Sequence, residues 1–138
     1  MTLDSSALIA ILFSEPGYLD LVDRILVADD VRIGSPTLVE TRMVFTGRLR
    51  QKASSRLAGP TGLAGLVDQL LMELGIGIVP FGEREAHLAA DAFRRFGRGR
   101  HPAGLNFGDC LAYATAVAAQ DTLLYVGDDF AKTDIIAA

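Results

Sequence analysis

Apolar residues along this chain follow two patterns, short continuous runs and longer stretches with helical spacing. Short runs bounded by Gly, Asp or Pro predict buried strands, and apolar residues that recur every three or four positions predict helices that pack through one face. The strands expected in this way lie at 1–4, 31–34, 75–80 and 122–126, and a shorter edge strand is possible at 135–136. All four main strands are expected to be short and buried.

Helices are predicted between these strands by apolar periodicity and by capping residues. The expected helices span 7–13, 18–28, a stretch that opens at 35–37, 63–74, 83–96, and a stretch that starts at Asn106. A segment rich in Ser, Gly and Ala predicts a break over 51–62. In the helix over 18–28, the residues expected to face the core are Leu19, Val22, Ile25 and Leu26.

Strands that alternate with helices predict βαβ units and a mostly parallel sheet covered by helices on both faces. The sequence therefore predicts an α/β fold, a three-layer α/β/α sandwich, formed by one domain over residues 1–138. Right-handed crossovers bring the carboxyl ends of all parallel strands to one edge, where such folds bind their ligands.

The amino-acid composition and net charge exclude several kinds of functional site. The chain of 138 residues has one cysteine, two histidines and a formal charge of −4. These numbers argue against a zinc site, a disulfide framework or bulk electrostatic coating of nucleic acid. Cys110 is expected to be a buried, inert thiol. Neither a signal peptide nor a membrane span is recognisable, and the single cysteine fits a protein of the reducing cytoplasm.

Four acids fall at positions where a parallel sheet would gather them. Asp4 ends the first strand, Glu40 lies early in the helix after the second strand, and Asp128 follows the fourth. These three are expected at the same edge of the sheet. Asp109 starts a helix that precedes a strand, so the pattern alone leaves open whether its loop brings it to that edge.

Each acid also has a simpler explanation. Asn106 with Asp109, and Thr37 with Glu40, match the capping box of a helix start, and Asp128 lies in an ordinary polar turn. Taken together, however, an oxygen-only set of ligands suits a hard cation such as Mg²⁺ or Mn²⁺. Clustered carboxylates without a cation would repel one another.

Several segments resemble one known family. They are LDSSAL at 3–8, SPTLVE at 35–40, GRGRHPAGLNFGDC at 97–110 and GDDFAKTDI at 127–135. These segments are similar to those of PIN-domain ribonucleases, and most similar to the VapC-type toxins of bacterial toxin–antitoxin pairs. The stretch at 97–110 is the most specific part of the resemblance, which extends over nearly the whole chain.

The resemblance implies an endoribonuclease that depends on Mg²⁺ or Mn²⁺, with Asp4 and Asp109 as the principal metal ligands and Glu40 as a third acid. Ser6 matches a small hydroxyl that supports the site. Many family members carry Thr-x-Asp where this chain has two adjacent acids at 128–129, and Asp128 is favoured there. The resemblance further implies a small antitoxin partner and a homodimer.

Basic residues crowd the approach to Asp109, either as a solvated face or as a grip on RNA phosphates. Arg98, Arg100 and His101 are the candidate RNA contacts, whereas Arg94 and Arg95 lie on a helix and can point away. A phosphotransferase of the haloacid-dehalogenase type is disfavoured because Ser6 stands where a second acid is needed. The remaining alternative is a PIN-like module that binds a partner without catalysis.

Overall fold

The computed structural model describes residues 1–52 and 60–138. Its sheet has four strands in the described residues, β1 (Thr2–Leu3), β2 (Arg32–Gly34), β3 (Gly77–Val79) and β4 (Leu123–Leu124), in the order β3-β2-β1-β4. Every neighbouring pair is parallel. The chain therefore leaves β1 for β2 on one side and returns to β4 on the other, so the direction of winding switches beside β1.

The helices follow the strands much as predicted. They are α1 (Ser5–Leu12), α2 (Tyr18–Val27), α3 (Ser35–Lys52), α4 (Pro60–Glu73), α5 (Glu83–Phe96) and α6 (Phe107–Ala119), with a short 3₁₀ turn at Phe130–Lys132. The predicted break at 51–62 falls largely on residues 53–59, which lie outside the described residues. The possible strand at 135–136 is reduced to a parallel bridge between Leu123 and Ala137.

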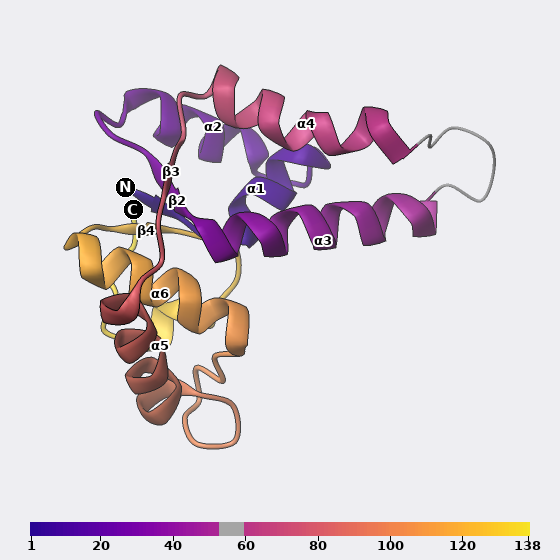
Figure 1. The fold of residues 1–138 in the computed structure, drawn as a ribbon. Helices are drawn as coiled ribbons and strands as arrows, with labels where there is room; N and C mark the ends of the chain where they lie inside the picture. The colour runs from indigo at the N-terminus through magenta and orange to yellow at the C-terminus, as the bar shows by residue number, and fades with distance from the viewer. Residues whose placement is uncertain (53–59) are drawn as a thin grey trace.

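Two apolar cores lie on the two faces of the sheet. Leu8, Ile33 and Val67 belong to the core under α1, α2, α3 and α4, whereas Leu105 and Ala112 belong to the core under α5 and α6. Figure 1 shows α3 and α4 extending together on one side, with α5 and α6 grouped on the other. The predicted three-layer α/β/α sandwich with a parallel sheet is confirmed.

Two expectations about burial were wrong. In α2 the expected Ile25 is buried and Val22 packs partly buried against the core. The second buried residue, however, is Leu21, and Leu19 and Leu26 are 62% and 63% exposed. Both faces of this helix carry apolar residues, so periodicity alone did not identify the inward one. The strand β3 is not buried, because it forms an edge of the sheet and leaves Ile78 53% exposed.

Small residues let α6 approach the sheet closely. Ala112, Ala114 and Ala116 are fully buried, and Thr115 lies so near Gly34 of β2 that a Cβ on that glycine would come within 2.6 Å of the Thr115 hydroxyl. The loop before α6 is closed by a bridge between Gly97 and Leu105. This packing determines where the first turn of α6, and with it Asp109, lies.

None of the helices in the described parts of the chain combines the length and apolar character that crossing a membrane requires.

Candidate functional site

Asp4 is a buried carboxylate where β1 passes into α1. Its backbone N–H donates to the carbonyl of Leu124, and its Oδ2 accepts from the Ser6 N–H at 2.9 Å and the Ser6 hydroxyl at 2.5 Å. The other oxygen, Oδ1, is buried with no hydrogen-bond partner among the described residues. Burial raises the pKa of Asp4, although the bonds from Ser6 oppose this shift. One oxygen of this carboxylate, Oδ2, thus caps α1, and the other, Oδ1, has no hydrogen-bond donor among the described residues.

Ser6 connects Asp4 to the segment after β4. Its hydroxyl donates to Asp4 and accepts from the backbone N–H of Val126 at 3.0 Å. One side chain therefore fixes the orientation of the Asp4 carboxylate relative to the chain that leads to the acids at 128–129. This is the geometry that a supporting role for Ser6 requires.

Glu40 extends from α3 toward the first turn of α6. Its carboxylate lies against Gly108, and its Oε2 is buried without a hydrogen-bond partner among the described residues. Burial raises the pKa of Glu40 most, the negative charges of Asp4 and Asp109 raise it further, and a hydrogen bond from the Ser5 side chain opposes them. Elements distant in sequence thus bring three carboxylates within electrostatic range of one another.

Asp109 caps α6 and belongs to this acidic group as well. Its Oδ2 accepts from the Asn106 N–H at 2.7 Å, while the Asn106 side chain accepts from the Asp109 N–H at 3.1 Å. Burial nevertheless raises the pKa of Asp109, and the charges of Asp4 and Asp129 add to the rise. The capping explanation and the acidic-site explanation are therefore compatible, because one carboxylate does both.

The structure separates the two acids of the turn after β4. Both Asp128 and Asp129 are exposed. The charge from this turn that raises the pKa of Asp109 is that of Asp129, not that of the favoured Asp128. Asp129 is thus the member of the pair whose charge acts on the acidic site.

These residues fit a divalent cation by their chemistry. In residues 1–52 and 60–138, no three Asp, Glu, His or Cys side chains converge closely enough to enclose an ion. The acids instead leave two buried carboxylate oxygens, on Asp4 and Glu40, without a donor. A buried acceptor without a donor is costly, and a hard cation is the partner that an oxygen-only set prefers.

The candidate RNA contacts lie in the loop between α5 and α6. Arg98 is exposed, and its positive charge acts on Asp109. The guanidinium of Arg100 lies 5.8 Å from the ring centre of Phe93. His101 is used inside the loop, since its Nδ1 accepts from the Ala103 N–H and its ring packs edge-on against Phe96. Both arginines are thus exposed, with Arg100 beside Phe93, whereas His101 holds the loop together.

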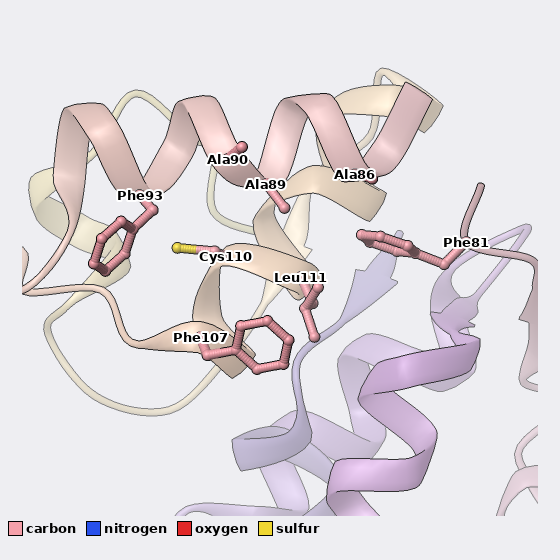
Figure 2. A pocket seen from close by; sticks show the side chains of 8 residues that line it. All are labelled: Phe81, Ala86, Ala89, Ala90, Phe93, Phe107, Cys110 and Leu111. Carbon is pink, nitrogen blue, oxygen red and sulfur yellow. The ribbon is translucent and has the colours of Figure 1, made fainter. Parts of the chain in front are cut away.

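An apolar groove lies between α5 and the start of α6 (Figure 2). It has a volume of about 560 Å³ and is lined by Phe81, Ala86, Ala89, Ala90, Phe93, Phe107, Cys110 and Leu111. Burial raises the pKa of Cys110 to about 11, so the thiol stays protonated near neutral pH. This agrees with the expected inert cysteine.

Sequence reasoning missed two residues of the site, Ser5 and Gly108. Ser5 precedes a recognised position and supplies a hydrogen bond to Glu40. Gly108 offered a signal that could have been used, because a glycine in the first turn of an alanine-rich helix is a poor helix former.

The fold and the site together define an α/β protein with a carboxylate site, suited to a divalent cation, where the winding of the sheet switches. The PIN domain family matches residues 1–136, and the chain belongs to this family.

Known relatives agree with the VapC-type resemblance. Ribonuclease VapC28 of Mycobacterium tuberculosis is 38% identical over 136 residues, which cover 98% of this chain and 95% of that protein. Ribonuclease VapC of Mycolicibacterium smegmatis is 35% identical over 138 residues, 99% of this chain and 98% of that protein.

Solved structures show the same fold at low identity. The M. tuberculosis toxin VapC20, described as cleaving the sarcin-ricin loop, superposes with a TM-score of 0.72 at 11% identity, covering 99% of this chain and 97% of that one. The VapBC2 complex of Rickettsia felis, bound to a DNA fragment from its promoter, gives 0.67 at 12% identity and covers 99% and 96%.

Proposed function

We propose that this protein is a metal-dependent endoribonuclease of the VapC type, the toxin of a toxin–antitoxin pair, acting as one domain over residues 1–138. The observation that carries the proposal is the group of Asp4, Glu40 and Asp109, whose charges act on one another while two carboxylate oxygens stay buried without donors. Relatives named as ribonucleases support RNA as the substrate. An RNA substrate in turn favours the cytoplasm as the place of action.

In this proposal Asp4 and Asp109 would hold Mg²⁺ or Mn²⁺. Such a cation would supply a water of lowered pKa and neutralise charge at the phosphate. In the same proposal Glu40, whose own pKa is raised, orients a water or holds its proton. Asp129 takes the part of the fourth acid in preference to Asp128.

Arg98 and Arg100 complete the proposed site by contacting RNA phosphates. Both side chains are exposed in the loop that leads to Asp109, where their charge offsets the repulsion between the acids and the RNA backbone. His101 contributes by keeping this loop in shape, and its contact with RNA stays a prediction.

The direct test is cleavage of a labelled single-stranded or stem-loop RNA by pure protein. We expect cleavage with Mg²⁺ or Mn²⁺, loss of cleavage in excess chelator, and loss in Asp109→Asn. Asp23→Asn, an exposed acid of α2, is the matched control and should cleave normally. Asp129→Asn should impair cleavage more than Asp128→Asn. Undiminished cleavage by Asp109→Asn in chelator would reject the mechanism, and no cleavage of any RNA would favour the non-catalytic PIN-like module.

The antitoxin partner is tested by co-expression with the neighbouring gene. We expect the neighbour to relieve growth arrest and to copurify with this chain, because antitoxin side chains can occupy the acidic site. If neither happens, the toxin role fails even where RNA cleavage is observed. The homodimer stays a prediction, which light scattering of the pure protein would decide.

A further inference from the structure

Gly108 lies where α6 meets the carboxylate of Glu40. A Cβ built on this glycine would overlap the Glu40 carboxyl carbon and both of its oxygens. The space that any other residue would fill with its side chain is therefore occupied by the carboxylate. In most helix–helix contacts such space is filled by apolar atoms, but here it is filled by a carboxylate oxygen that lacks a donor.

The backbone does not explain this glycine. Gly108 is the second residue of α6, and its φ is not in the left-handed region, where glycine is favoured. Alanine would be the better helix former at a helical backbone of this kind. The three heavy atoms that an added Cβ would meet most closely all belong to the Glu40 carboxylate, so the room at position 108 is taken by Glu40.

We propose that Gly108 is a positioning residue for Glu40. Its missing side chain admits the Glu40 carboxylate to the first turn of α6, next to Asp109. The proposal rests on the proposed function only for its effect on catalysis, since the contact between Gly108 and Glu40 is a property of the fold.

The predicted effect of Gly108→Ala follows from which atoms would have to move. The overlapping atoms are the end of a long, flexible side chain rather than backbone, so Glu40 can swing away while the helices stay in place. The variant should therefore fold as well as the wild type and lose the placement of one carboxylate. Changes to groups that support a metal site commonly lower metal affinity or activity by about 10- to 100-fold.

The experiment is a double-mutant cycle on Gly108→Ala and Glu40→Ala. Gly47→Ala is the matched control, because Gly47 is a helical glycine of α3 whose added Cβ, apart from the backbone of its own helix, would meet no heavy atom of the described residues within 4 Å. Thermal melts in chelator report the fold, melts with Mn²⁺ alone report metal binding, and kcat on RNA reports catalysis.

We expect Gly108→Ala to melt in chelator at or above the wild-type temperature, and to lose Mn²⁺ affinity and kcat as far as Glu40→Ala does. The double variant should lose nothing more, because the two changes act through one carboxylate. Gly47→Ala should keep wild-type values throughout.

Wild-type Mn²⁺ affinity and kcat in Gly108→Ala would overturn the proposal, and so would losses that add in full to those of Glu40→Ala. Wild-type Mn²⁺ affinity and kcat in Glu40→Ala would also overturn the proposal, because neither quantity would then depend on where the Glu40 carboxylate lies. If the wild-type protein cleaves no RNA, the proposed function fails, while the Mn²⁺ melts still decide the role of Gly108.

Discussion

At the scale of single residues, Asp109 combines two demands that usually fall on different side chains. Its hydrogen bond from the Asn106 N–H and its place in the first turn of α6 favour the charged form, as in any helix cap. Burial and the charges of Asp4 and Asp129 disfavour that form, and together they prevail and raise the pKa of Asp109. The metal-free protein thus keeps a carboxylate whose charge is poorly accommodated.

We therefore expect Asp109→Asn to stabilise the metal-free protein near neutral pH. The helix-end interaction of a charge is about 0.3–1 kcal/mol, whereas two like charges 4 Å apart repel by about 1 kcal/mol in water and about 4 kcal/mol at a partly buried site. An asparagine can still accept from Asn106, so the cap survives. Thermal melts with and without Mn²⁺ check this, and the variant should also lose most of the metal-induced shift. Destabilisation in chelator with an unchanged Mn²⁺ shift would leave Asp109 as a cap only.

At the scale of elements, the C-terminal segment is attached to α5 and α6 by three side chains. The Tyr113 hydroxyl donates to Asp134 at 2.7 Å, and Arg95 donates to the other oxygen of Asp134 at 2.6 Å. Burial alone would raise the pKa of Asp134, but these two bonds outweigh it and lower the pKa. Burial raises the pKa of Tyr113 to about 12, so its hydroxyl remains a donor.

We expect Tyr113→Phe to lower the free energy of unfolding by about 0.5–1.5 kcal/mol, the usual net contribution of a hydrogen bond. Because the folded pKa of Asp134 is lowered, the stability from its charged form is present above about pH 4 and is lost as pH falls through the folded pKa. The difference between Tyr113→Phe and wild type should thus shrink from pH 7 to pH 3 in urea unfolding. Tyr125→Phe, on a ring that packs against Phe130, is the control, and an equal loss there would contradict the assignment.

At the scale of the whole molecule, the proposed function requires an acidic protein with a net charge of −4 to bind a polyanion. We propose that a local arrangement makes this possible, because Arg98 and Arg100 lie in the loop that leads to the acids. Local placement of a few cations can support RNA binding even where the overall charge opposes it.

We expect Arg98→Ala combined with Arg100→Ala to weaken RNA binding and to leave the Mn²⁺ shift of the melting temperature intact. The slope of log affinity against log salt should fall by about 0.7 for each lost phosphate contact, thus by about 1.4 for two. Binding titrations at several salt concentrations measure this slope. The pair Arg24→Ala and Arg48→Ala, which changes the net charge equally, should leave the slope nearly unchanged. Equal slopes in both double variants would make the loop an ordinary solvated face.

The sequence by itself determined where most helices and strands lie and which residues mark their ends. The alternation of short apolar runs with helical stretches predicted the parallel three-layer fold, and Asp4 at the end of the first strand marked the edge where ligands bind. Asn106 identified the start of α6, because a cap acts on the backbone only two or three residues away. Features of this kind depend on residues that are close in the sequence, so they can be predicted from the sequence alone.

Only the tertiary structure decided how distant elements meet. Periodicity did not choose between the two apolar faces of α2, because burial depends on the helices packed against it. The pattern left open whether Asp109 reaches the acids. The resemblance favoured Asp128 as the fourth acid, whereas in the structure the charge that acts on Asp109 is that of Asp129. The role of Gly108 was invisible for the same reason, since the carboxylate that fills its missing side chain comes from another helix. Helices and their caps depend on residues that are adjacent in the sequence. A functional site depends on how distant segments pack against one another, and no short stretch of sequence contains that information.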